Sequence, residues 1–218
     1  MFNNNIVEIL LNYIFLSKCL YCKRYGKIIC DNCLNKINRE YLFKKVNNDW
    51  FDYVFCGCFY EGKIRTQIHS FKFHEQAYLY KYFIQICLRD KKIYEFLKKF
   101  DYITYVPMYY KKEQKRGYNQ SKLLAEELGK NLELQVIELL EKKKENKVQS
   151  SLSEKDRIKN VKNIFCFKDN SIKNNSIKGK NIILVDDILT TGATVRASSK
   201  ILKENEAEEI CVFTVAKT

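Results

Sequence analysis

Two adjacent acids at the end of an apolar run are the residues of this sequence best suited to chemistry. Asp186 and Asp187 follow Ile182 to Val185, four apolar residues in succession that are typical of a buried strand. Ligands of open α/β sheets bind beyond the carboxyl ends of strands, where paired carboxylates suit ribose hydroxyls or hydrated Mg²⁺. The acids could instead only cap the next helix, but capping needs a single side-chain oxygen.

The turn after the acids has the composition of a phosphate site. It consists of Thr190, Thr191, Gly192, Ala193 and Thr194, and a helix is expected to follow it. Its hydroxyls, with backbone N–H groups at the start of a helix, can bind a phosphate. The acids and the turn together predict a site for ribose 5-phosphate.

Four cysteines form a second candidate site. Cys19, Cys22, Cys30 and Cys33 make two Cys-x-x-Cys pairs, and four thiolates can surround Zn²⁺ in a closed, structural site. We predict that zinc stabilises a segment too small to build its own core. In the alternative interpretation this segment also contacts DNA or a protein partner through its basic residues, which are Lys18, Lys23, Arg24 and Lys27.

The other cysteines and both histidines are not expected to take part in chemistry. Neither His69 nor His74 has a carboxylate or nucleophile at a telling spacing, so we expect no mechanism based on histidine. The remaining thiols lie in apolar runs and are interpreted as buried packing residues, and they are Cys56, Cys58, Cys87, Cys166 and Cys211.

The elements that position these residues alternate in type along the second half of the chain. Strands are expected at 102–106, 134–139, 164–167, 182–185 and 210–215, and helices at 120–128 and 195–202. Earlier segments suggest a helix at 6–18, a strand at 50–59 and helices at 64–73 and 77–88. The alternation predicts an α/β fold with a mostly parallel sheet and helices on both faces. We expect an N-terminal helix and zinc-binding segment at 1–49 and the α/β domain at 50–218.

Length and composition fit a globular protein. The chain has 218 residues, of which 46% are apolar and 14% aromatic, which excludes a disordered chain. We find no signal peptide and no run of about 20 apolar residues, so we expect a cytoplasmic protein without a membrane span. The net charge of +13 would suit a polyanionic partner, but the abundance of Lys, Asn and Ile is also what an AT-rich genome produces.

The segment from Ile182 to Thr194 resembles the phosphoribosyl pyrophosphate (PRPP) signature of the type I phosphoribosyltransferases. The rest of the chain resembles the ComF family of competence-associated proteins over about residues 5–217. The resemblance implies a type I phosphoribosyltransferase fold, with a hood-like part at 50–99 and a core at 100–218. The motifs that carry it, besides the four cysteines, are Tyr60-x-Gly62, Ile64-Arg65, Ile68, Phe71-Lys72-Phe73, Val106-Pro107, Arg116 to Gln120, Gln149, Arg157, Asn160 and Phe165.

The resemblance also implies roles for individual residues. Asp186 and Asp187 would bind the ribose hydroxyls and Mg²⁺, and Arg116 and Gly117 would contact the pyrophosphate, so that Asp186, Asp187 and Arg116 are the candidate catalytic residues. The 5-phosphate would bind to Thr190, Thr191, Gly192, Ala193 and Thr194. A flexible loop that closes over the site is implied at 142–160, although its lysines could also be a solvated loop. The candidate residues of this loop are Lys142, Lys143, Lys144, Gln149 and Arg157.

The sequence departs from the family pattern in a few places. A proline before the first cysteine is replaced by Ser17-Lys18. Arginines common in the loop are lysines here, which keeps the charge but loses the bidentate contact with phosphate. A glycine common near the last strand is Glu206, and we expect Asn205 to adopt the left-handed conformation in its place.

Two functions from different classes follow from the resemblance. An enzyme would displace pyrophosphate from C1 of PRPP with a nitrogen nucleophile, helped mainly by electrostatics; no residue identifies the acceptor, so activity stays open. The alternative is a protein that handles single-stranded DNA in natural transformation, together with the competence machinery, and uses its PRPP pocket without turnover. Tyr109, Tyr110 and Tyr118 lie near several lysines, a mixture that suits DNA binding, unless these tyrosines pack on the sheet.

Overall fold

The computed structural model describes residues 18–27, 29–37, 40–47, 50–73, 76–143, 164–168 and 177–218. The expected N-terminal helix lies outside these residues, apart from Lys18. The chain divides into two compact units, residues 1–39 and residues 40–218. This division precedes the expected boundary at 49/50, because strand β1 (Leu42–Lys45) pairs with β2 (Tyr53–Phe59) of the second unit.

The first unit is built around its cysteines. Its described helix is the single turn α2 (Asp31–Leu34), which begins after Cys30. An isolated antiparallel bridge joins Lys18 to Tyr25. The buried apolar residues among the described part of this unit are Cys19, Ile29 and Ile37, too few to form a conventional core.

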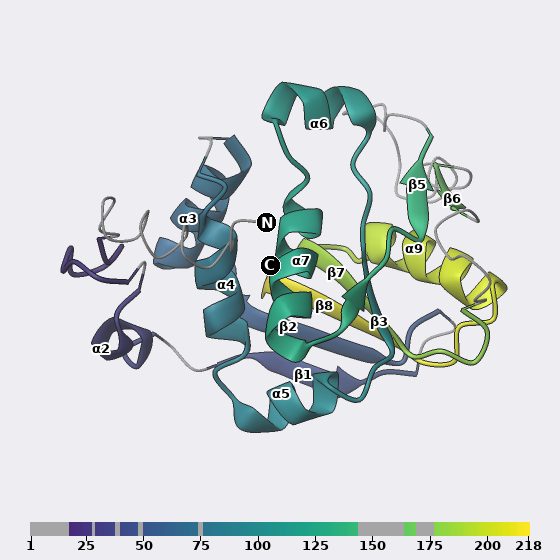
Figure 1. Ribbon diagram of the computed structural model, residues 1–218, viewed down its shortest axis with the longest axis horizontal. Coiled ribbons are helices and arrows are strands. Elements are labelled where there is room, and N and C mark those ends of the chain that lie inside the picture. The colour runs from purple at the N-terminus through teal and green to yellow at the C-terminus, as the bar shows by residue number, and fades with distance from the viewer. Residues whose placement is uncertain are drawn as a thin grey trace, which may run out of the picture. The chain divides into compact units, whose positions relative to one another are not determined.

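A six-stranded sheet forms the centre of the second unit (Figure 1). Its order is β1-β2-β8-β7-β3-β4, and all its pairs are parallel except β1 with β2. The prediction of a mostly parallel sheet is therefore confirmed. The remaining strands of the sheet are β3 (Tyr102–Tyr105), β4 (Gln135–Val136), β7 (Ile182–Leu189) and β8 (Ile210–Lys217).

Helices cover both faces of this sheet, as predicted (Figure 1). On one face, α9 (Ala193–Glu204) packs Val195 and Leu202 into a core with Leu184 and Val212 of the central strands. On the other face, α4 (Leu79–Cys87) and α7 (Gln120–Leu132) contact each other and the strands. The other helices are α3 (Gly62–Phe73), α5 (Lys91–Leu97) and α6 (Tyr110–Arg116).

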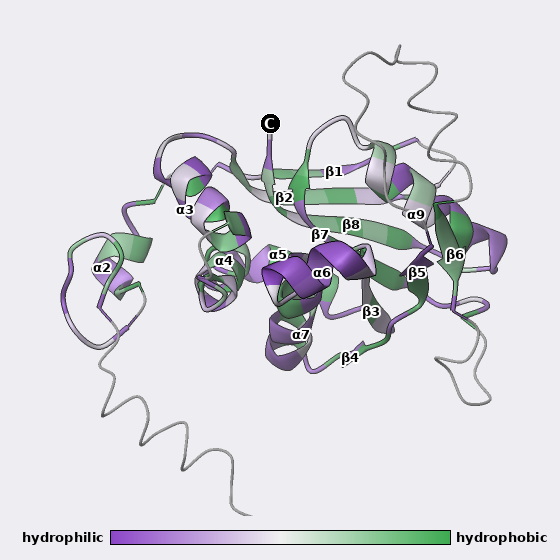
Figure 2. Cartoon of the chain, turned by 90° about the horizontal axis from the view of Figure 1, so that it is seen from above, coloured by the Kyte–Doolittle hydropathy of each residue, from purple (hydrophilic) through white to green (hydrophobic). Residues whose placement is uncertain are grey.

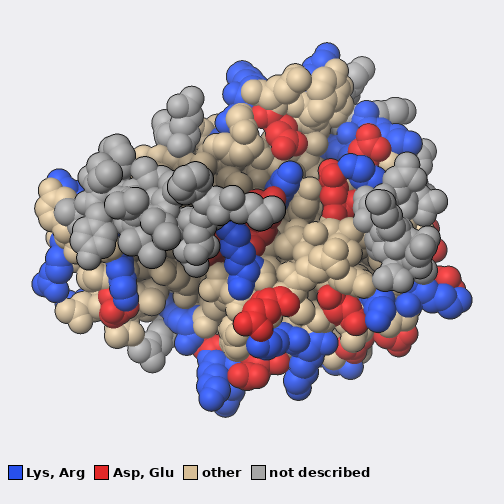
Figure 3. Space-filling model, in the orientation of Figure 1, with Lys and Arg blue, Asp and Glu red and all other residues tan. Residues whose placement is uncertain are grey.

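Helix α6 was not expected from the sequence. It has no buried residue, and Figure 2 shows it as hydrophilic, in contrast to the hydrophobic strand β8. Without an apolar stripe, such a helix leaves no periodic pattern for sequence analysis to detect. On the face drawn in Figure 3, Lys and Arg side chains are interspersed with Asp and Glu.

The expected strand at 134–139 is wrong in part. Only Gln135 and Val136 pair with the short strand β3. The chain then turns, with the Leu139 N–H donating to Ile137 O at 3.1 Å. It continues as β5 (Leu140–Lys142), which pairs with β6 (Phe165–Phe167) in a separate antiparallel sheet.

Two predictions about single residues are also corrected. Glu206 itself adopts the left-handed conformation, with φ of 66°, whereas Asn205 has φ of −99°. Cys166 is partly exposed, because β6 lies in the small two-stranded sheet. The interpretation of the other four packing thiols, Cys56, Cys58, Cys87 and Cys211, as buried is confirmed.

Candidate functional site

The connections after β3 and β7 run in opposite directions across the sheet. The chain passes from β3 through α6 and α7 to β4, and from β7 through α9 to β8 on the other side. A crevice forms beyond the carboxyl ends of two neighbouring strands where such connections diverge, and this is the usual ligand site of open α/β sheets. The sheet therefore places its candidate site at the ends of β3 and β7.

The two acids lie beyond the end of β3 but still within β7. Strand β3 ends with Tyr105 opposite Val185, whereas β8 continues to pair with β7 as far as Leu189. We expected the strand to end at Val185, before the acids. This is wrong by four residues, since β7 runs from Ile182 to Leu189. Asp186 and Asp187 extend past the neighbouring strand on one side only.

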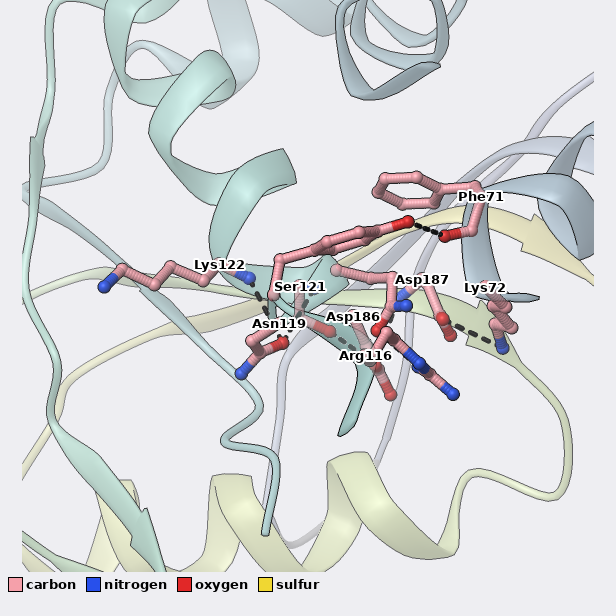
Figure 4. Close-up of polar contacts among 10 residues, drawn as sticks. Phe71, Lys72, Arg116, Asn119, Ser121, Lys122, Asp186 and Asp187 are labelled. Carbon is pink, nitrogen blue, oxygen red and sulfur yellow. Dashed lines mark hydrogen bonds and ion pairs between the residues drawn. The ribbon is translucent and has the colours of Figure 1, made fainter. Parts of the chain in front are cut away.

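Asp186 is held by two hydrogen bonds (Figure 4). Its Oδ1 accepts from the Ser121 hydroxyl at 2.9 Å and from the Asp187 N–H at 2.9 Å. Burial and then the neighbouring Asp187 charge raise the pKa of Asp186 from 3.8 to about 7, against the opposing effect of both hydrogen bonds. The site thus keeps one carboxylate that is costly to ionise.

The start of α7 fixes the position of Ser121. Asn119 caps this helix, because its side chain accepts from the N–H groups of Ser121 at 3.0 Å and Lys122 at 3.4 Å. The same side chain donates to Val106 O at 3.2 Å, which ties the helix to the end of β3. The sequence marked Asn119 as part of a family motif but gave no role to it or to Ser121.

Helix α3 contributes a cation that the sequence analysis did not assign. The Lys72 Nζ lies 2.8 Å from Asp187 Oδ2, and both side chains are largely shielded from solvent. Figure 4 shows the lysine directed from α3 toward the acid. The only signal in the sequence was that Lys72 belongs to the Phe71-Lys72-Phe73 motif.

The two residues predicted to contact pyrophosphate, Arg116 and Gly117, lie at the end of α6. Arg116 is its last residue and donates to Gln120 Oε1 at 2.6 Å. Its guanidinium lies 5.3 Å from the centre of the Phe73 ring. Gly117 follows with φ of 84°, a conformation that favours glycine. Phe73 is next to Lys72 in α3, and Lys72 contacts Asp187. Arg116 therefore lies on the same side of the acid pair as Lys72 (Figure 4).

The threonine-rich turn connects β7 to α9. Thr190 and Thr191 are exposed, and Gly192 precedes the helix with φ of 76°. The Thr191 Oγ1 accepts from the Ala193 N–H at 3.4 Å. Helix α9 begins at Ala193, so Ala193 and Thr194 belong to its first turn, and its first N–H groups and its dipole point toward the connection from β7.

Few residues of the expected flexible loop are described. Lys142 is the last residue of β5, with its Nζ 5.3 Å from the centre of the Phe165 ring. Lys143 donates its N–H to Ile164 O at 2.9 Å. Lys144, Gln149 and Arg157 lie outside the described residues.

The four cysteines of the first unit come together as expected. Their Sγ atoms all lie within 4.8 Å of one another, and those of Cys22 and Cys30 are 3.6 Å apart. Burial alone would raise the pKa of the Cys19 thiol, but hydrogen bonds from nearby backbone N–H groups lower it to about 6. Four converging soft ligands fit Zn²⁺, so this cluster could bind a metal.

Comparisons with known proteins agree with this arrangement. Residues 115–218 match the phosphoribosyl transferase domain family. The chain is 32% identical over 207 residues to competence protein F of Haemophilus influenzae, covering 90% of this chain and 84% of that protein. This chain belongs to the ComF family of competence proteins.

Other matches to this ComF chain are more partial. The DNA utilization protein YhgH of Escherichia coli is 31% identical over 119 residues, which cover 54% of the ComF chain and 50% of YhgH. The chain thus spans about half the length of that relative. A hypoxanthine phosphoribosyltransferase from Staphylococcus aureus aligns with 12% identity and a TM-score of 0.38, over 62% of this chain and 61% of its own. Across the part of the ComF chain that the structure describes, each helix is too short or too polar to cross a membrane.

Proposed function

We propose that this ComF protein binds PRPP, or a related ribose 5-phosphate, together with Mg²⁺ at the end of β7. The observation that carries the proposal is the acid pair beyond β3, followed on the same chain by the turn at the start of α9. Asp186 and Asp187 would accept the ribose hydroxyls, and the turn would bind the 5-phosphate. The matched phosphoribosyl transferase domain supports this choice of ligand.

A buried amide that precedes Ser121 in the chain also supports a phosphate ligand. Gln120 is only 1% exposed, and its Nε2 has no hydrogen-bond partner among the described residues. A buried donor without a partner is costly. A phosphate oxygen would accept from this amide, which lies next to Arg116 through the hydrogen bond to its Oε1.

The acid pair fits a bound magnesium ion as well. Mg²⁺ prefers carboxylate oxygens and water, and Asp187 already accommodates a cation, the Lys72 ammonium. When bound, the metal would neutralise negative charge on the pyrophosphate. Asp186 and Asp187 would hold it together with the ribose hydroxyls.

The reaction that such a site supports is phosphoribosyl transfer to a nitrogen acceptor. The bond between C1 of the ribose and the pyrophosphate oxygen breaks, a bond from C1 to the acceptor nitrogen forms, and the nitrogen loses its proton to solvent water. Arg116 would stabilise the leaving pyrophosphate, and the two acids would offset positive charge that develops on the sugar. Turnover is measured as pyrophosphate release with a panel of purines, pyrimidines and amines.

Calorimetric titration with Mg-PRPP tests the proposed site. We expect binding by the wild type and its loss in the double variant Asp186→Asn, Asp187→Asn. A hydrogen bond to a charged group contributes about 1.5–3 kcal/mol, so each acid should account for roughly a ten- to hundred-fold change in affinity. The control is Glu126→Gln with Glu127→Gln, an adjacent acid pair on α7. Absence of binding by the wild type, or equal binding by both double variants, would contradict the proposal.

A second candidate function is binding of single-stranded DNA at α6. Lys111, Lys112 and Lys115 are exposed on this helix, and Figure 3 shows basic side chains at its surface. Tyr110 is 55% exposed, so it does not pack on the sheet, and its ring lies 4.8 Å from that of Tyr109. Lysines with an exposed aromatic ring suit a single strand, and YhgH is named a DNA utilization protein.

Salt titrations with an oligothymidylate distinguish this candidate. Each phosphate contact contributes a slope of about −0.7 to the dependence of log affinity on log salt for single strands. Changing Lys111, Lys112 and Lys115 to Gln should therefore weaken binding and reduce the slope by about 2. The same change at Lys91, Lys92 and Lys99, which are exposed around α5, is the control. An equal effect of both triple variants would contradict a DNA-binding role of α6.

A further inference from the structure

The ion pair between Lys72 and Asp187 occupies a carboxylate that the proposed function requires for its ligand. The Nζ to Oδ2 distance is 2.8 Å, with side-chain exposures of 23% for the lysine and 16% for the acid. Such shielding makes the pair stronger than an ordinary surface ion pair. A metal ion bound to Asp187 would repel this ammonium, and a hydroxyl that takes Oδ2 would displace it, so the ammonium would then need a new partner.

The residues on either side of Lys72 hold it in place at the site. The Tyr118 hydroxyl donates to Phe71 O at 2.5 Å, and the two rings stack with centroids 5.8 Å apart. The Phe73 ring lies under the Arg116 guanidinium. The end of α3 is thereby joined to the segment that leads into α7, while the four-carbon side chain of Lys72 leaves its ammonium free to turn about a fixed backbone.

The position of a pyrophosphate relative to the acids follows from the chemistry of PRPP. Its pyrophosphate is attached at C1, the carbon next to the one that bears the 2-hydroxyl. If Asp187 binds the ribose hydroxyls, the first phosphate lies within a few ångströms of the carboxylate that Lys72 now contacts. Arg116 lies on the same side through Phe73.

We propose that Lys72 moves from Asp187 to the pyrophosphate of the bound ligand, where it acts together with Arg116. This inference rests on the proposed function, because it needs the ribose at the acid pair. In the ligand-free protein the lysine balances the charge of two adjacent acids. In the complex its point charge would meet phosphate oxygens, for which an ammonium is well suited.

Comparison of two ligands on Lys72→Met tests this role. Ribose 5-phosphate shares the ribose and the 5-phosphate with PRPP but lacks the pyrophosphate. With Mg²⁺ present, we expect K72M to bind PRPP about ten- to hundred-fold more weakly, while its affinity for ribose 5-phosphate does not fall. Lys72→Arg keeps a cation and should retain most of the PRPP affinity. Lys63→Met, in the exposed first turn of α3, should bind both ligands as the wild type does.

The other results would overturn the inference. Equal weakening of both ligands would mean that Lys72 only supports the position of α3 or Asp187, and equal strengthening would mean that it only competes for the acid. Lys72→Gln is measured alongside, because it allows the same comparison if K72M unfolds. Wild-type protein that binds neither ligand would overturn the proposed function as well. Wild-type binding of both ligands, left unchanged by K72M, would overturn only the role of Lys72.

Discussion

At the scale of single residues, the ligand-binding role proposed for Asp186 conflicts with the stability of the fold. Its pKa is raised from 3.8 to about 7 by burial and by the adjacent Asp187. Because the folded protein binds this proton more tightly than the unfolded chain, the stability of the fold decreases as the pH rises from about 4 to about 7. Ionisation of Asp186 at the proposed site would thus come at a cost to folding, a cost that is common at functional sites.

Replacement of Asp186 by Asn should therefore stabilise the fold at high pH. The Asn oxygen can still accept from Ser121 and from the Asp187 N–H, while the buried charge disappears. At about pH 8 we expect the midpoint temperature of thermal unfolding to rise by at least about 2–4 °C, which is the shift for 1 kcal/mol in a chain of this size. At about pH 4 the rise should be smaller. Glu126→Gln, on the exposed side of α7, is the control. An equal gain at both pH values would show that ionisation of Asp186 is not the cause.

At the scale of elements, β2 and α4 approach each other so closely that the strand requires a glycine. A Cβ added at Gly57 would lie 2.2 Å from Cys87 Sγ and 3.3 Å from Val215 O. The first distance is far inside van der Waals contact, and the backbone oxygen cannot turn away. Gly57 therefore fixes the distance between this strand and the helix layer, and Cys87 is its partner in the contact.

Gly57→Ala should destabilise the second unit by about 1–3 kcal/mol, the usual cost of overpacking a core. Adding Cys87→Ala removes the closest atom, so the double variant should be more stable than the sum of the single changes predicts. Urea unfolding of the four proteins gives this coupling. Cys211→Ala, which removes another buried thiol, should instead be additive with Gly57→Ala. If the effects of Gly57→Ala and Cys87→Ala on the free energy of unfolding were also additive, the proposed contact between the two residues would be contradicted.

At the scale of the whole molecule, the two compact units differ in what stabilises them. The second unit contains the six-stranded sheet with cores on both faces. The first has few buried apolar residues in its described part and a cluster of four thiols. A segment of this size usually depends on a bound metal for its fold.

Removal of zinc should unfold the first unit and leave the second folded. We expect one zinc per chain in the wild type. Cys22→Ser or a chelator should abolish hydrogen-exchange protection at residues 18–37, while the thermal unfolding of the sheet and the affinity for Mg-PRPP stay unchanged. Cys166→Ser, a partly exposed thiol of β6, should have neither effect. A metal content well below one per chain would contradict the assignment.

The predictions that are confirmed concern patterns contained in short segments. The apolar run of β7 and the periodic apolar residues of α7 and α9 each report burial through their own spacing. The prediction failed where contacts between segments decide the structure, as in β4, which pairs with β3 over two residues only. Helix α6 has no buried face to mark it, and the left-handed turn formed at Glu206 rather than at Asn205.

The sequence by itself determined the α/β fold class, the family, the four-cysteine cluster and the segment that carries the acids and the threonine turn. Each of these depends on residue types at fixed short spacings. Only the tertiary structure decided that Lys72 pairs with Asp187, that Ser121 holds Asp186, and that Arg116 lies on Phe73. These contacts join helices α3, α6 and α7 to strand β7 across long stretches of chain. Their partners are chosen by how the helices pack on the sheet, which no local pattern records.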